Sequence, residues 1–145
     1  MYAHITWHTW RRVGCIDAVA ADDIKLIALR AGKRTGVEVL RAAVLTDHVH
    51  FAVSFRPDTR LSDFVRLVKS NSALNANRRV VGMVRWCRGC YVATLHKNDL
   101  GRVLRYIDRQ FQRHPQLIPT DSAALRARFS NPGREPGVNE RERGS

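Results

Sequence analysis

A short stretch near the middle of the chain, Asp47-His48-Val49-His50-Phe51, alternates polar and apolar side chains. Successive side chains of a β-strand point to opposite faces of the sheet, so His48 and His50 share one face while Val49 and Phe51 share the other. The alternation therefore predicts a strand that is buried on its apolar side. Its other side carries two imidazoles held close together, which are a candidate pair of metal ligands. Asp47 is the nearest carboxylate, but its place before the strand favours a role in a turn or a cap.

The charge of the chain narrows the class of partner. Its 145 residues suit one domain, and 25 Lys and Arg against 13 Asp and Glu give a net charge of +12. An excess this one-sided favours a polyanion, with nucleic acid ahead of a membrane surface. No stretch approaches the ~18 consecutive apolar residues of a membrane-spanning helix, and no signal peptide opens the chain. We therefore expect a cytoplasmic protein with no membrane partner.

The cysteines do not form a disulfide framework. There are three of them, Cys15, Cys87 and Cys90, and an odd number favours a reducing compartment. Cys87-Arg88-Gly89-Cys90 has the spacing of half a zinc knuckle or of a redox pair. Because no second half is present in the sequence, a structural role for this segment is favoured over a zinc site.

The spacing of apolar residues predicts the order β-α-β-β-α-β followed by a third helix. The expected extended segments are His4–Trp10, Gly36–Leu45, His48–Phe55, Val84–Trp86 and Tyr91–Leu95. The expected helices begin at Asp22 or Asp23, after a cap at Asp58 or Thr59, and after a cap at Asn98, and the first ends at Gly32 or Gly36. The predicted fold class is α+β: a ferredoxin-like, split β-α-β antiparallel sheet with helices on one face plus a C-terminal helix.

The third helix carries a second pair of candidate functional residues, Tyr106 and Gln110. It is expected to run to about His114, before Pro115, with an apolar stripe that buries it. Tyr106 and Gln110 lie outside that stripe, and their spacing of four puts them on one face of the helix. The residues that follow mix proline, glycine and both charges. We therefore predict a single domain over residues 1–118 and a flexible tail over 119–145.

These two segments resemble sequence motifs of a known protein family. His48-Val49-His50 resembles the His-hydrophobic-His signature of the HUH endonucleases. Tyr106-Ile107-Asp108-Arg109-Gln110 resembles the tyrosine-x-x-x-glutamine helix of the single-tyrosine transposases of bacterial insertion sequences, which include the REP-associated relatives. The similarity extends in order from about Tyr2 to His114, although Thr46 stands where the family usually has proline. It implies a DNA transposase that cleaves and rejoins single-stranded DNA at hairpin ends.

The resemblance also implies roles for individual residues. His48, His50 and Gln110 would hold a divalent metal ion, and Tyr106 would be the catalytic nucleophile that forms a 5′-phosphotyrosine and frees a 3′-hydroxyl. Two imidazoles and an amide oxygen suit Mg²⁺ or Mn²⁺, which are expected first, and would also accept Zn²⁺ or Co²⁺.

The expected partner is single-stranded DNA with hairpin structure. A homodimer is expected as well, in which the tyrosine helix can serve the partner's site, although the REP-associated relatives can act as monomers. Candidate DNA-binding residues combine one aromatic ring with the exposed basic side chains: Trp10, Arg11, Arg12, Arg66, Lys69, Arg78, Arg79, Arg102, Arg109 and Arg113.

Two alternatives remain open from the sequence. A non-catalytic basic nucleic-acid-binding domain explains the charge but gives no role to Tyr106 and Gln110. A metal-dependent nuclease that uses water explains the histidines but leaves the tyrosine idle.

Overall fold

The protein forms a four-stranded antiparallel sheet covered by helices on both faces. A computed structural model describes residues 1–121, so most of the predicted tail, 119–145, lies outside the described residues. The strands are β1 (Tyr2–His8), β2 (Val37–Val44), β3 (His48–Phe55) and β4 (Tyr91–Leu95), in the order β2-β3-β1-β4. The helices are α1 (Ala18–Thr35), α2 (Leu61–Arg79), α3 (Leu100–Asp108) and α4 (Gln110–Arg113), with 3-10 turns at Trp10–Arg12, Lys97–Asp99 and Pro115–Leu117. The predicted fold class is confirmed.

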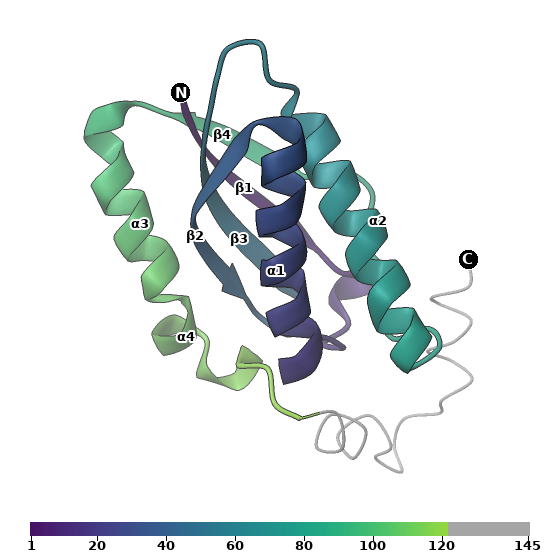
Figure 1. Ribbon diagram of the computed structural model, residues 1–145. Coiled ribbons are helices and arrows are strands. Elements are labelled where there is room, and N and C mark those ends of the chain that lie inside the picture. Colours follow the sequence, from purple (N-terminus) through teal and green to yellow (C-terminus); the bar gives the residue numbers. More distant parts are fainter. Residues whose placement is uncertain (122–145) are drawn as a thin grey trace.

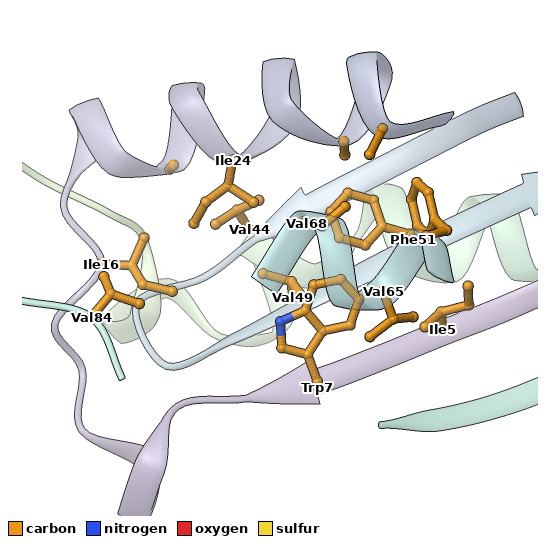
Figure 2. Close-up of a cluster of buried hydrophobic side chains, with 14 of the residues drawn as sticks. Ile5, Trp7, Ile16, Ile24, Val44, Val49, Phe51, Val65, Val68 and Val84 are labelled. Atoms are coloured by element: carbon orange, nitrogen blue, oxygen red, sulfur yellow. The ribbon is translucent and has the colours of Figure 1, made fainter. Parts of the chain in front are cut away.

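The apolar face of the sheet packs against α1 and α2, which lie side by side over it (Figure 1). Val49 and Phe51 of β3 are fully buried there, as the alternation predicts, and Ile5 and Trp7 of β1 join them. Figure 2 shows Trp7 in this core beside Val49 and Val65. The rings of Trp7 and Phe51 lie 5.3 Å apart. Trp7 is therefore a core residue.

The other face of the sheet is covered by α3. A smaller cluster joins Val103 and Ile107 of α3 to Ala43, Leu45 and Ala52 of β2, β3 and the turn between them. Ala52 follows His48 and His50 at alternate positions of β3, so the histidines lie on this same face. The fold thus places the two segments that carry the resemblance against one another.

The start of α1 differs from the prediction. The helix begins at Ala18, not after Asp22 or Asp23, and Asp17 is its N-cap, accepting a hydrogen bond from the Ala20 amide at 2.9 Å. Asp17 is fully buried and forms a two-point ion pair with Arg79 at the end of α2, at 2.6 and 2.9 Å. A partner 62 residues away fixes this cap, and no local pattern reveals it.

Three further boundaries differ. Helix α2 begins at Leu61 after Arg60, and no side-chain cap from Asp58 or Thr59 forms. The predicted strand Val84–Trp86 contributes only a single bridge, from Trp86 to Thr9. The predicted third helix breaks at Arg109, which has φ −93° and ψ 3° and joins α3 to α4.

Gly36 ends α1, as one of the two predicted positions, with a left-handed φ of 79° that glycine adopts readily.

Among the helices of residues 1–121, none has the length and apolar content of a membrane-spanning segment.

Candidate metal and nucleophile site

Strand pairing brings a row of histidines together on the face under α3. In the antiparallel register of β1 and β3, His8 lies opposite His48 and Thr6 lies opposite His50. His4, two residues before Thr6, reaches His50 diagonally, and the two rings stack with centroids 5.2 Å apart. The rings of His48 and His50 are 4.9 Å apart. The two-residue spacing thus produces the close imidazole pair that the sequence predicts.

Both candidate ligand histidines are held through Nδ1. His48 Nδ1 lies 2.6 Å from Asp47 Oδ1, and His50 Nδ1 lies 3.0 Å from His4 Nε2. The turn that carries Asp47 is fixed by the backbone, because its carbonyl accepts from the Thr9 amide at 2.8 Å. Asp47 is thus a turn residue, as predicted, and its carboxylate also contacts a histidine. In both rings Nε2 remains for another contact.

Gln110 lies buried against this pair. It is 1% exposed, and its amide nitrogen donates to the Tyr106 carbonyl at 3.1 Å across the break in the helix. Among residues 1–121, two of the buried polar atoms without a hydrogen-bond partner are His50 Nε2 and Gln110 Oε1. Buried polar atoms are nearly always paired. An imidazole nitrogen and an amide oxygen left open at one place fit a metal ion that accepts such ligands.

The third candidate ligand at this site is the amide of Gln110. Within the part of the chain that the structure describes, no three His, Cys, Asp or Glu side chains form a group that could hold a metal ion. The oxygen of Gln110 is a candidate ligand atom of another type beside His48 and His50. The residues present fit the ion that the resemblance implies.

Electrostatics keeps the central imidazole neutral. The pKa of His50 is lowered to about 3, chiefly by burial and also by the charges of His48, His4 and His114, while the Gln110 amide opposes the shift. Burial also lowers the pKa of His4. A neutral imidazole keeps the lone pair that a metal ion requires.

Tyr106 lies beside the histidines of its own chain. Its ring makes edge contacts with His50 and His4, at centroid distances of 5.8 and 5.9 Å, and it is 38% exposed. The Arg113 guanidinium lies 5.1 Å from the centre of the same ring. The tyrosine and the candidate ligands therefore meet within one chain.

A cavity of about 560 Å³ opens over this cluster. Its wall combines the polar face of the sheet, the start of α4 and the loop that holds the cysteines: Thr6, Trp7, His8, Arg12, His48, His50, Cys87, Arg88, Gly89, Cys90, Tyr91, Tyr106, Gln110 and His114. Lys69 of α2 fixes the loop by donating to the carbonyls of Cys87 and Gly89, at 2.7 and 2.9 Å. The cysteines are free thiols, and this loop has a structural place at the rim.

The predicted DNA-binding residues are scattered. Two of them reach the cavity cluster: Arg113 over Tyr106, and Arg12 in the wall. Arg11 and Arg12 have left-handed backbones, with φ of 54° and 53°, a strained state for arginine. The guanidinium groups of Arg85 and Arg11 both lie over the Trp10 ring, at 4.6 and 5.7 Å from its centre.

The remaining basic candidates lie elsewhere. Lys69 binds the loop carbonyls and Arg79 binds Asp17, so both have structural partners. Arg66 and Arg102 form exposed pairs with acids three residues earlier. Arg78 lines a groove between α1 and α2, and Arg109 is exposed at the helix break.

Two residues of the site carry no signal in the local sequence. His4 contacts His50, and the His114 ring meets the His48 ring at 6.2 Å. Alternation puts His4 and His8 on one face of β1, but only the register of β1 against β3 shows which of them meets His50. His114 reaches His48 because the chain turns after α4.

The antiparallel sheet, with a histidine pair on one face and a tyrosine helix beside it, has the architecture of the HUH class. Residues 1–110 match the family described as "Transposase IS200 like". The chain therefore belongs to the IS200-like transposase family. The matched region ends at Gln110, so it contains the histidine pair and the tyrosine helix together.

Individual relatives agree with this assignment. The ISDra2 transposase TnpA of Deinococcus radiodurans is 26% identical over 114 residues, which cover 74% of this chain and 81% of the relative. The transposase for insertion sequence element IS200 of Salmonella typhimurium is 29% identical over 83 residues, 52% of this chain, and the match spans only 54% of that relative.

Two solved structures share the fold. A putative transposase from Deinococcus radiodurans R1 superimposes with a TM-score of 0.59 at 24% identity, covering 76% of this chain and 90% of that one. A REP-associated tyrosine transposase, solved bound to a REP hairpin, gives a TM-score of 0.66 at 14% identity, with 78% and 67% covered. At these identities the likeness concerns the fold.

Proposed function

We propose that this transposase cleaves and rejoins single-stranded DNA through a covalent 5′-phosphotyrosine on Tyr106. The observation that carries the proposal is the pair of open buried atoms, His50 Nε2 and Gln110 Oε1, beside the partly exposed ring of Tyr106. Buried polar atoms without a partner are unfavourable for stability. Their presence next to a tyrosine is explained when a metal ion and a phosphate meet there.

His48, His50 and Gln110 would hold a divalent ion, Mg²⁺ or Mn²⁺, as the resemblance implies. When bound, the ion supplies charge that polarises the scissile phosphate. A tyrosine hydroxyl, with an ordinary pKa near 10, is a poor nucleophile at neutral pH, so this help matters. The protein contributes the orientation, since the backbone carbonyl of Tyr106 holds the Gln110 amide.

The proposed cleavage step is a transesterification. The Tyr106 hydroxyl oxygen forms a bond to phosphorus while the bond from phosphorus to the 3′-oxygen breaks. The phenol loses its proton and the departing oxygen gains one, which leaves a free 3′-hydroxyl. Rejoining is the reverse attack by a 3′-hydroxyl, and it needs no ATP because the phosphotyrosine conserves the bond energy.

Single-stranded DNA with hairpin structure is the proposed substrate. The net charge of +12 and the arginines at the cavity, Arg12 and Arg113, favour a phosphate backbone. A structural relative was solved with a REP hairpin, which supports the choice of hairpin ends. Tyr106 lies beside His50 of its own chain, which supports a reaction in which each chain uses its own tyrosine. A homodimer stays a prediction, which sedimentation of the purified protein tests.

The decisive experiment is denaturing-gel detection of a covalent adduct with hairpin-ended single-stranded DNA, with and without Mn²⁺. We expect an adduct with the native protein, none with Tyr106→Phe, and unchanged DNA binding by that variant. Cleavage by Tyr106→Phe without an adduct would support a water-using nuclease instead. Binding without cleavage by the native protein would support a non-catalytic DNA-binding domain.

A further inference from the structure

Each of the two candidate ligand histidines has one ring nitrogen engaged by a neighbour that is not itself a candidate ligand. Asp47 Oδ1 lies 2.6 Å from His48 Nδ1, and His4 Nε2 lies 3.0 Å from His50 Nδ1. The two contacts come from different elements, the turn before β3 and the strand β1. In both cases the engaged nitrogen is Nδ1, so the arrangement repeats.

The contact at His48 fixes its tautomer. An ionised carboxylate only accepts hydrogen bonds, so the proton of the His48 ring lies on Nδ1 and points at Asp47. Nε2 of His48 then carries the lone pair. The distance is short, as in charge-assisted hydrogen bonds, and Asp47 is itself held in the turn through its carbonyl.

The contact at His50 permits two arrangements, and only one leaves the ring ready for a metal. When His50 carries its proton on Nδ1 it donates to His4 Nε2, and its own Nε2 keeps a lone pair. When His4 donates instead, the proton of His50 moves to Nε2. His50 Nε2 is buried with no hydrogen-bond partner among residues 1–121. A side-chain acceptor near His50 is that of Gln110, whose interaction opposes the lowering of the His50 pKa, but Nε2 and Gln110 Oε1 form no hydrogen bond in the structure. A proton on Nε2 would therefore be a poorly satisfied buried donor, which is unfavourable.

Rotation of the His50 ring is also restricted. The His4 ring stacks on it at an interplanar angle of 20°, while Tyr106 meets it edge-on from α3. The ring therefore cannot turn freely to exchange its two nitrogens.

We propose, on the basis of the metal site proposed above, that His4 and Asp47 are positioning residues: they hold Nδ1 of His50 and His48 so that both Nε2 lone pairs face the place where the divalent ion binds. Such contacts in metal sites orient the ring and raise its basicity, and removing them weakens metal affinity by about 10- to 100-fold.

Ring tautomers are read first, in the metal-free protein, by long-range ¹H–¹⁵N NMR of the histidine side chains. We expect His48 and His50 to carry their protons on Nδ1. His4→Phe keeps a stacked ring but removes the acceptor, so His50 should shift toward the Nε2-protonated form. Asp47→Ala should do the same for His48. Unchanged tautomers in both folded variants would overturn the proposal.

Mn²⁺ affinity, measured by titration calorimetry, is the second readout. We expect the Kd for Mn²⁺ to rise about 10- to 100-fold in His4→Phe and in Asp47→Ala. His4→Gln and Asp47→Asn retain an acceptor oxygen, so their Kd should lie closer to that of the native protein. His96→Asn is the control, since it removes a histidine that caps the turn after β4, outside the cavity, and should leave Kd unchanged.

The two readouts separate this proposal from the proposed function. If the native protein takes up no Mn²⁺, the metal site fails, while the NMR spectra still decide whether His4 and Asp47 set the tautomers. If the native protein binds Mn²⁺ and the folded variants bind it equally well, the metal site stands and the positioning role is wrong. Circular dichroism confirms that each variant is folded, and the two conservative variants provide the comparison should His4→Phe or Asp47→Ala unfold.

Discussion

Two sets of buried polar side chains, one against each face of the sheet, differ in their hydrogen bonding. On the face covered by α1 and α2, the buried carboxylate of Asp17 is fully used, since it caps α1 and pairs at two points with Arg79. On the face under α3, His50 Nε2 and Gln110 Oε1 are buried and open. The hydrogen bonds of Asp17 stabilise the fold, whereas the unpaired atoms of His50 and Gln110 lower its stability. Trp7 Nε1, in the core under α1 and α2, is also buried without a partner, so it is the position of the open pair beside Tyr106 that supports the chemistry proposed for the α3 face.

The largest effect is expected when the buried amide on the α3 face is replaced by an apolar side chain. Gln110→Leu fills a similar volume and removes the unpaired amide oxygen. We expect adduct formation to fall below detection, while the free energy of unfolding stays constant or rises by about 1–2 kcal/mol because a buried unpaired group is gone. Adduct gels and urea denaturation measure the two quantities. Full activity in Gln110→Leu would show that Gln110 is not a ligand.

A smaller effect, on stability alone, is expected when the hydrogen bonds of the buried Asp17 carboxylate are removed. Asp17→Ala removes a helix cap and leaves Arg79 without its carboxylate, which should lower the free energy of unfolding by about 2–4 kcal/mol. The matched control is Asp63→Ala, which breaks the exposed pair with Arg66 and should change stability by less than about 1 kcal/mol. Equal decreases in urea denaturation of the two variants would contradict this difference. Mn²⁺ affinity should be unchanged in both.

The smallest effect concerns DNA. Arg113→Ala removes a cation over Tyr106, on the α3 face, whereas Arg78→Ala removes one from the groove between α1 and α2. If DNA lies on the α3 face, only Arg113→Ala should reduce the salt dependence of binding, by about 0.7 in the log–log slope for each single-strand phosphate that the protein no longer neutralises. Fluorescence anisotropy at several salt concentrations measures the slope. A comparable change in Arg78→Ala would mean that DNA also binds the helical face.

The local sequence predicts the parts of the site that depend on periodicity. Alternation gives the shared face of His48 and His50, and a spacing of four brings Tyr106 and Gln110 onto one side of a helix. The order of strands and helices follows from the same periodicities, and the match to the family confirms the resemblance.

What the sequence does not reveal depends on distant partners. The cap at Asp17 is fixed by Arg79, and the contact of His4 with His50 depends on strand register. The break at Arg109 has no glycine or proline to announce it. In each case the free energy that decides the structure comes from interactions between segments far apart in the chain, which no window of local sequence contains.

The segment after α4 ties the far end of the described chain to the histidine turn. The Thr46 amide donates to the Leu117 carbonyl at 2.9 Å, and the Ala18 amide donates to the Thr120 carbonyl at 2.6 Å. The amino group of Met1, by contrast, binds the Phe55 carbonyl at the opposite end of β3, roughly 23 Å from His48 for seven residue steps of about 3.3 Å. A fluorophore or surface tether attached at residue 1 therefore leaves the cavity accessible, whereas a probe attached near Leu117, whose carbonyl binds Thr46, would lie close to the histidine turn.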